Sequence, residues 1–217
     1  MKTGDITTPL LRFLRDAEAA EALLDASDTQ FARRTYIRAL FAYIEGAVWI
    51  LKYTCRNGRR YKSSPGISPG EYALLGDVSY DLKENGDVFE QAKFLRLPEN
   101  LRFCVKMFNR LFGSAIDLKV GETNWQNFKQ AIAIRHRITH PKHDTDFDIS
   151  DAEIDQCKQT CLWFNQISSD AIHAVFDSSK RAMEELKKAE KAKEPNSERS
   201  DSPERESGRG LNKPGNE

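Results

Sequence analysis

The chain of 217 residues carries 33 Lys and Arg against 33 Asp and Glu, so its formal net charge is +0. This length predicts one domain of ordinary size with room for an appendage. The balanced charge excludes a global basic field, so RNA binding would require a local basic patch. The first residues, MKTGDITTPL, contain no apolar signal region, and no run approaches roughly 18 apolar residues. We therefore expect a cytoplasmic protein with no membrane association.

Two helices are predicted in the first quarter of the chain. Thr-Thr-Pro at residues 7–9 combines an N-cap signal with proline at the first helical position, which predicts a helix from about Pro9 to Leu24. A second helix is predicted from about Gln30 to Arg56. Its apolar residues recur with a period of about 3.6 residues, so we expect it to lie at the centre of the bundle. These residues are Tyr36, Ile37, Leu40, Phe41, Ile44, Val48 and Leu51.

One acidic residue interrupts the apolar side of this second helix. On a helical wheel with about 3.6 residues per turn, Glu45 lies within about 40° of Phe41 and about 60° of Val48. We therefore expect its carboxylate to face the core side, where it would need a partner.

The middle of the chain is predicted to hold a loop and two helices. The second helix ends at Arg-Asn-Gly, residues 56–58, and a basic stretch rich in Gly, Pro and Ser follows as a loop. A helix from about Pro69 to Asn85 and another from about Pro98 to Phe112 come next. No segment of the chain shows a convincing strand pattern.

The last part of the chain predicts two helices and a tail. Thr123 or Asn124 can cap a helix that stops before Pro141, which places His140 at or just past the last turn. Ser-Asp-Ala-Glu at residues 150–153 resembles a capping box and opens a long helix to about Phe176. Residues 180–194 alternate Lys and Glu as a frayed helical extension, and residues 195–217 are too polar to fold.

These elements predict an all-α fold, an irregular bundle of five or six helices with a disordered C-terminal tail. The helical domain would span residues 1–178, and the charged, largely disordered tail would span residues 179–217.

The sequence RHRITHPK, residues 135–142, concentrates the chemistry of the chain. His140 can exchange a proton near neutral pH, and Arg135 is a permanent cation that can hold a phosphate. Arg135 shares a helical stripe with Trp125, so its guanidinium would be partly buried, and Glu45 is the obvious partner. The pair could equally be a core salt bridge with no catalytic use. In a continuous helix Arg135 and His140 would be about 140° apart, but Pro141 bends the chain out of the helix.

This arrangement resembles the HEPN superfamily, all-α proteins that include many RNases of toxin–antitoxin, phage-defence and CRISPR systems. The resemblance rests on the Arg-x4-His motif late in a helical bundle, on Arg34, Tyr36, Phe41 and Glu45 in the long second helix, on Trp125 and Phe128 before the motif, and on Pro-Lys after the histidine. It covers about residues 8–176. The family commonly has Asn or Asp at the second motif position, where this chain has His136, which can also hydrogen-bond a phosphate.

The resemblance implies a metal-independent endoribonuclease with Arg135 and His140 as the catalytic pair and no cofactor. The ribose 2′-hydroxyl would attack the adjacent phosphate, leaving a 2′,3′-cyclic phosphate and a 5′-hydroxyl. His136, Glu45 and Lys142 would support the pair. Independently of the resemblance, Arg56, Arg59 and Arg60 cluster with Tyr61 in the basic loop and could contact an RNA backbone, with Arg137 as a further cation, or they could equally form a solvated loop. The resemblance further implies a homodimer and an antitoxin or defence partner protein.

Other interpretations of the same residues remain open. The spacing of His136, His140 and His143 allows a zinc site, although the nearest acids follow the proline. Cys157 and Cys161 lie on an apolar stripe and are expected to be buried thiols. A non-catalytic HEPN-like domain that binds nucleotides or RNA, or that serves for dimerisation, would have the same fold. The two functions differ in whether Arg135 and His140 are accessible to solvent across a shared cleft.

Overall fold

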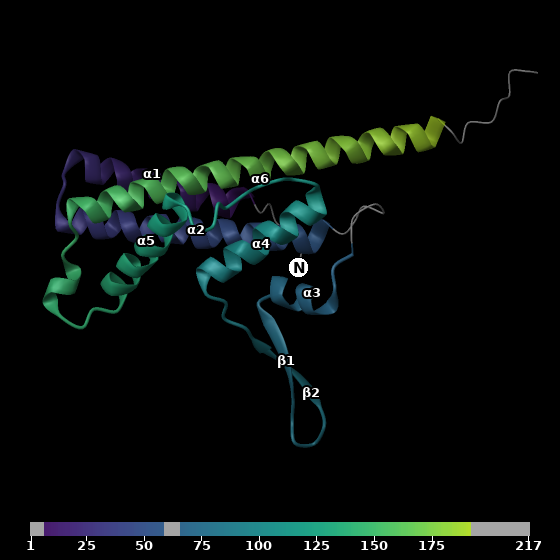
Figure 1. The fold of residues 1–217 in the computed structure, drawn as a ribbon, viewed down its shortest axis with the longest axis horizontal. Coiled ribbons are helices and arrows are strands. Elements are labelled where there is room, and N and C mark those ends of the chain that lie inside the picture. Colours follow the sequence, from purple (N-terminus) through teal and green to yellow (C-terminus); the bar gives the residue numbers. More distant parts are fainter. Residues whose placement is uncertain (1–6, 59–65, 192–217) are drawn as a thin grey trace, which may run out of the picture. The chain divides into compact units, whose positions relative to one another are not determined.

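The computed structural model describes residues 7–58 and 66–191, which form six α-helices, a short 3-10 helix and one β-hairpin (Figure 1). The fold is therefore all-α apart from the hairpin, as predicted. The elements in chain order are α1 (Thr7–Ala26), α2 (Gln30–Asn57), α3 (Pro69–Leu75), β1 (Val78–Leu82), β2 (Val88–Ala92), α4 (Leu97–Phe112), α5 (Thr123–Thr139), η2 (Asp144–Phe147) and α6 (Asp151–Lys191).

The chain divides into two compact units, Met1–Lys180 and Arg181–Glu217. In the second unit the described residues, 181–191, are helical and almost all exposed. The extension expected over residues 180–194 is thus regular helix as far as Lys191. The tail predicted for residues 195–217 lies outside the described residues.

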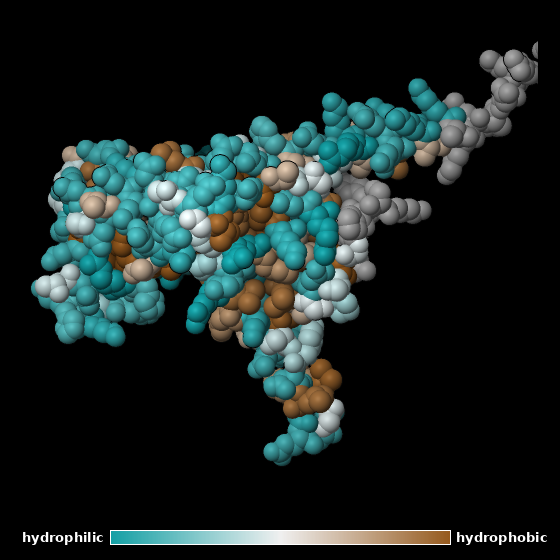
Figure 2. All heavy atoms as spheres, viewed as in Figure 1, coloured by the Kyte–Doolittle hydropathy of each residue, from teal (hydrophilic) through white to brown (hydrophobic). Residues whose placement is uncertain are grey.

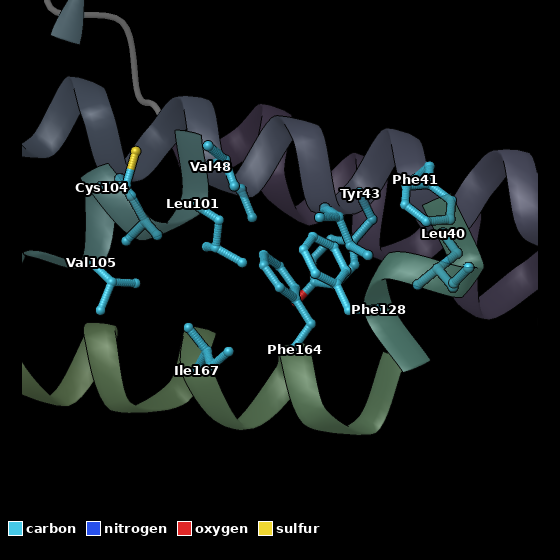
Figure 3. Close-up of a cluster of buried hydrophobic side chains, with 14 of the residues drawn as sticks. Leu40, Phe41, Tyr43, Val48, Leu101, Cys104, Val105, Phe128, Phe164 and Ile167 are labelled. Atoms are coloured by element: carbon cyan, nitrogen blue, oxygen red, sulfur yellow. The ribbon is translucent and has the colours of Figure 1, made fainter. Parts of the chain in front are cut away.

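The predicted central position of α2 is confirmed, because residues on both sides of this helix are buried. Thr29 caps its start by accepting a hydrogen bond of 3.2 Å from the Ala32 N–H. One side packs against α1, which runs beside it (Figure 1). The other side meets α4, α5 and α6 in a single core (Figure 3). Each fully buried side chain of this kind contributes about 1.5–3 kcal/mol relative to exposure.

Aromatic residues join three of the helices at the centre of this core. Phe128 of α5 and Phe164 of α6 are both fully buried beside α2 (Figure 3). Tyr43 of α2 meets Phe164 edge to face at a centroid distance of 5.7 Å. Its hydroxyl donates to the Asn165 amide oxygen over 3.0 Å, so the polar end of this buried ring has a partner. The packing fixes α5 and α6 against the helix that carries Glu45.

The helix predicted from Pro69 to Asn85 is wrong beyond Leu75. Ser68 and Glu71 form a capping box at its start, but Gly76 ends it and Asp77 adopts a left-handed φ of 54°. The chain then forms the antiparallel hairpin β1–β2, in which Tyr80 faces Glu90 in the register. The expectation that no segment forms a strand is therefore wrong here. The signals that could have indicated the hairpin are the alternation in Val-Ser-Tyr-Asp-Leu and the Asn-Gly dipeptide at residues 85–86, which favours a hairpin turn.

The other helix boundaries differ little from the predicted ones. The first helix begins at Thr7 rather than Pro9, and the fourth begins at Leu97 rather than Pro98. Neither predicted cap of α5 is correct, because Glu122 occupies the N-cap position without a side-chain hydrogen bond. The capping box before α6 is confirmed by reciprocal bonds between Ser150 and Glu153 of 2.9 and 3.4 Å.

Candidate functional site

The predicted end of α5 before Pro141 is confirmed. The last helical residue is Thr139, and its hydroxyl donates to the Arg135 carbonyl over 2.7 Å. His140 is the C-cap, with φ −127° and ψ 61°, and its N–H still donates to the His136 carbonyl over 3.0 Å. The imidazole of His140 is therefore presented at the point where the chain leaves the helix.

The predicted contact between Glu45 and Arg135 is present in the structure. Nη2 of Arg135 donates to Oε1 of Glu45 over 2.9 Å, which joins α5 to α2. The pair is more exposed than the sequence predicted, since 35% of the arginine side chain and 45% of the glutamate side chain are accessible. The reason is that both residues line an open cleft and not the closed core.

Two histidines lie together next to this pair. The rings of His136 and His140 have centroids 4.9 Å apart with an interplanar angle of 56°, and both residues are exposed. His136 lines the cleft with Arg135, whereas His140 is not among its lining residues. The end of α5 thus presents one half-exposed guanidinium and two accessible imidazoles.

The cleft has a volume of about 870 Å³ and lies between the C-terminal half of α5 and the first turn of α4, with α2 as its floor. Figure 2 shows the surface hollowed between α5 and the base of the hairpin. Apolar and charged side chains alternate around it. The lining residues are Phe41, Glu45, Val48, Trp49, Lys52, Asp77, Leu95, Arg96, Leu97, Pro98, Glu99, Asn100, Ile132, Arg135 and His136.

Lys52 is a buried cation in the floor of the cleft. Only 2% of its side chain is exposed, and its Nζ pairs with Oδ1 of Asp77. The burial of an ammonium group requires such a partner. Asp77 has the left-handed φ of 54°, so the pair anchors the strained start of the hairpin to α2. This pair was not predicted from the sequence, although Lys52 follows Val48 by four residues on the apolar stripe of the helix.

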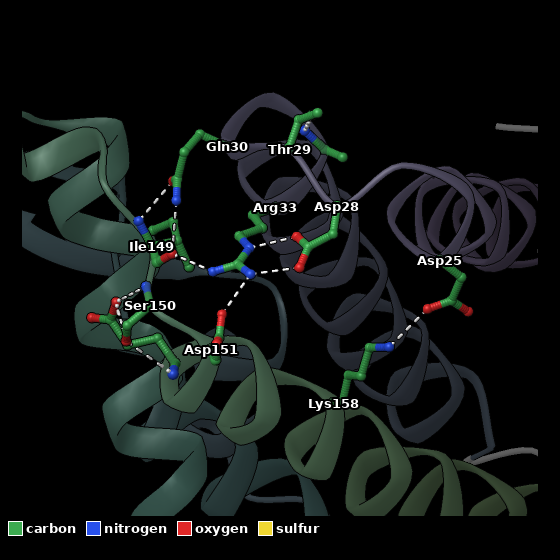
Figure 4. Close-up of polar contacts among 11 residues, drawn as sticks. Asp25, Asp28, Thr29, Gln30, Arg33, Ile149, Ser150, Asp151 and Lys158 are labelled. Carbon is green, nitrogen blue, oxygen red and sulfur yellow. Dashed lines mark hydrogen bonds and ion pairs between the residues drawn. The ribbon is translucent and has the colours of Figure 1, made fainter.

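The loop after α5 is tied to the start of α2 by polar contacts (Figure 4). The Gln30 amide exchanges two hydrogen bonds with the Ile149 backbone, of 2.8 and 2.9 Å. Arg33 donates to the Ile149 carbonyl over 2.7 Å, and Arg34 donates to the Phe147 carbonyl over 3.0 Å. These contacts restrain the segment that follows His140.

The remaining cations proposed from the sequence have mixed surroundings. Arg137 is half-buried and donates to Glu153 over 2.8 Å, so its guanidinium is directed at α6. Lys142 is exposed, and its backbone N–H donates to Asp146 over 2.7 Å. Arg56 packs over the Tyr72 ring at 4.5 Å from the centroid. Arg59 and Arg60 lie outside the described residues.

The cysteines have the surroundings expected of structural thiols. Cys55, Cys104 and Cys157 are buried, and Cys161 is half-buried. Burial raises the pKa of Cys55 to about 12 and that of Cys157 to about 12, so both thiols stay protonated near neutral pH. Within residues 7–58 and 66–191, no group of three His, Cys, Asp or Glu side chains is placed to hold a metal ion.

No family model, curated protein or solved structure matches this chain. Among the described helices, none is sufficiently long and apolar to cross a membrane.

Proposed function

We propose that the chain is a metal-independent endoribonuclease of the HEPN type, with Arg135 and His140 as its catalytic pair. The observation that carries this proposal is the exposed His140 at the C-cap of α5, one turn beyond a guanidinium that Glu45 holds from α2. A catalytic pair must be reached by its substrate. Because both side chains are accessible to solvent, their exposure supports a catalytic role for Arg135 and His140 over a purely structural one.

The proposed reaction is a transesterification within the RNA chain. The ribose 2′-oxygen loses its proton and forms a bond to the adjacent phosphorus while the bond to the 5′-oxygen breaks and that oxygen gains a proton. His140 serves as the base or the acid of this exchange, a role typically worth about 10²–10⁴ in rate. His136, whose ring lies 4.9 Å away, provides a second imidazole for the other proton.

Arg135 stabilises the charge that builds on the phosphorane-like transition state. Its guanidinium has five N–H donors, and Glu45 accepts from one nitrogen, so further donors can face a phosphate. Glu45 limits the rotation of the side chain and thereby positions those donors before the substrate arrives. The chemistry needs no metal because the substrate supplies its own nucleophile.

The biological setting belongs to the same proposal. An RNase of this type would act in a toxin–antitoxin or phage-defence system as a homodimer with an antitoxin or defence partner. A non-catalytic module that binds nucleotides or RNA is the second candidate function. The observation that favours it is that His140 does not line the cleft that Arg135 shares with His136.

An RNase assay on total cellular RNA with EDTA present tests the proposal. We expect the wild type to leave 2′,3′-cyclic phosphate ends, and we expect Arg135→Ala and His140→Ala to lose this activity while remaining folded by circular dichroism. His173→Ala and Arg102→Ala are matched controls, because both residues are exposed on other helices. Equal cleavage by His140→Ala and wild type would overturn the assigned catalytic pair. The absence of cleavage by the wild type would favour the binding module.

A further inference from the structure

We propose that the cleft beside Arg135 binds one nucleotide of single-stranded RNA, with its base stacked on Trp49. This inference rests on the proposed function, because it names the part of the substrate that the cleft receives. It adds a binding role for Trp49 and Arg96, which have no role in the proposed cleavage reaction.

The aromatic ring of Trp49 is not part of the hydrophobic core. The residue is 46% exposed on α2 and lines the cleft, whereas Trp125 is only 4% exposed and packs within the core. Tyr53, one turn further along α2, stacks on Trp49 with centroids 5.6 Å apart and an interplanar angle of 29°. The indole is thus supported on one side by Tyr53. Such aromatic surfaces bind the bases of single-stranded nucleic acids without sequence preference.

The charges around the cleft suit a nucleotide better than a plain apolar ligand. Glu45 and Asp77 are each paired with a cation, Arg135 and Lys52 respectively, so their charges are largely compensated. Arg96 is exposed at the cleft and has no ion pair with any described residue. Its guanidinium and that of Arg135 can hold phosphates, as arginines commonly do in RNA-binding grooves.

The remaining walls match the other parts of a nucleotide. Leu95, Leu97 and Ile132 give the cleft an apolar lining, which a base can contact. Glu99, in the first turn of α4, is exposed at the cleft and offers acceptors to ribose hydroxyls or base amino groups. The volume of about 870 Å³ lies within the range of about 300–1,000 Å³ that is common for small-ligand sites.

Tryptophan fluorescence of the full chain tests this inference. The protein is the His140→Ala variant, so binding is measured without cleavage, and the probes are the four nucleoside 3′-monophosphates, with ribose 5-phosphate as the probe that lacks a base. We expect the nucleotides to quench the fluorescence of the exposed Trp49 and ribose 5-phosphate to leave it unchanged.

Variants then separate the contribution of the ring from that of folding. By calorimetry, Trp49→Ala should bind the nucleotides about 5- to 150-fold more weakly, the loss expected for one base–aromatic stack. Trp49→Phe should retain most of the affinity because it keeps an aromatic face. Phe31→Ala is the matched control, since Phe31 is a 66% exposed aromatic residue elsewhere on α2.

Nucleotide binding in the cleft and RNA cleavage by Arg135 and His140 can be tested separately. Nucleotide binding that depends on Trp49 would support the cleft even if the wild type cleaved no RNA. RNA cleavage by Trp49→Ala with an unchanged KM, together with the absence of nucleotide quenching, would overturn the inference while leaving the ribonuclease proposal standing. Quenching by ribose 5-phosphate equal to that by nucleotides would also overturn it.

Discussion

Arg33 and Arg135 each link α2 to a later part of the chain, but their surroundings differ. The guanidinium of Arg33 makes four hydrogen bonds, two to Asp28 and one each to Asp151 and the Ile149 carbonyl (Figure 4). Only 13% of its side chain is exposed. Arg135 donates one side-chain hydrogen bond within the described part of the chain, to Glu45, and 35% of its side chain is exposed.

The difference separates a structural arginine from a candidate functional one. The hydrogen bonds that Arg33 donates to Asp28 and Asp151 raise the pKa of its guanidinium further above the ordinary value, and nearly all of its donors are used. Such a group holds the chain together and has little capacity left for a ligand. Arg135 is oriented by a single carboxylate and keeps donors directed at solvent, as a phosphate-binding group requires.

The largest expected effect is the loss of RNA cleavage in Arg135→Ala. Removing a donor that stabilises developing charge typically costs about 10²–10³ in rate, so kcat/KM should fall by at least about 10². The free energy of unfolding should change by no more than about 1 kcal/mol, because exposed ion pairs contribute little. Steady-state kinetics and urea denaturation measure the two quantities. A large loss of stability without a loss of kcat/KM would show that Arg135, like Arg33, is a structural residue.

Arg33→Ala should show the opposite behaviour. Deleting this guanidinium leaves the Ile149 carbonyl without its charged donor, a kind of bond worth about 1.5–3 kcal/mol. We expect urea denaturation to report a loss of stability of about that size. Arg102→Ala, which removes an exposed arginine of α4, is the control and should be nearly neutral. A neutral Arg33→Ala would contradict the structural role of Arg33.

Glu45→Gln tests how strongly orientation of Arg135 matters. The amide keeps an oxygen that can accept from Nη2 of Arg135 but loses the charge, which supplies about half the strength of such a bond. We expect kcat/KM to fall by about three- to tenfold, with KM for RNA changing less than kcat. The unfolding midpoint should stay close to that of the wild type. An unchanged kcat would indicate that Glu45 does not position Arg135.

The smallest effect concerns a second well-bonded arginine, Arg110, which holds Glu71 of α3 through two bonds of 2.9 and 2.8 Å. These bonds, together with the hydrogen bond that the Ser68 N–H donates to the same carboxylate, lower the pKa of Glu71 from 4.5 to about 2. Because the folded pKa lies below the unfolded one, the stabilisation is present above pH 4.5 and is lost as the pH falls toward 2. We therefore expect Glu71→Gln to be less stable than the wild type near neutral pH.

The pH dependence makes this prediction specific. Urea denaturation at several pH values should show the difference between Glu71→Gln and wild type shrinking as the pH drops below 4.5. Glu84→Gln is the control, since Glu84 is exposed in the hairpin turn. A difference that stays constant over this range would show that the charge of Glu71 does not contribute to stability.

The sequence predicted the parts of the site that depend on local patterns. The period of α2 placed Glu45 toward its later partner, Pro141 fixed the end of α5, and Ser150 with Glu153 marked the start of α6. The contact between Glu45 and Arg135 was predictable because a carboxylate and a guanidinium each interrupted an apolar stripe. A charged group on an apolar stripe needs a partner of opposite charge, and the Glu45 carboxylate and the Arg135 guanidinium are such partners for each other.

The parts that were not predicted depend on tertiary geometry or on a short ambiguous pattern. Five alternating residues, 78–82, fit either a strand or one face of a helix, and the choice was decided by Gly76 and the left-handed Asp77. The ion pair between Lys52 and Asp77 exists only because of that turn. The cleft could not be predicted from the sequence either, because Trp49 and Arg96 come together only through the packing of α4 against α2.

The most direct test of the central claim uses one RNA oligonucleotide that the protein cleaves and a copy with a single 2′-deoxynucleotide on the 5′ side of the cut. Both are incubated with the wild-type protein in EDTA, and the products are analysed by mass spectrometry. The account predicts a 2′,3′-cyclic phosphate from the RNA and no cleavage at the modified position, because the nucleophile is missing. Cleavage of the modified strand at that position would contradict the account, because another nucleophile would then be attacking the phosphate.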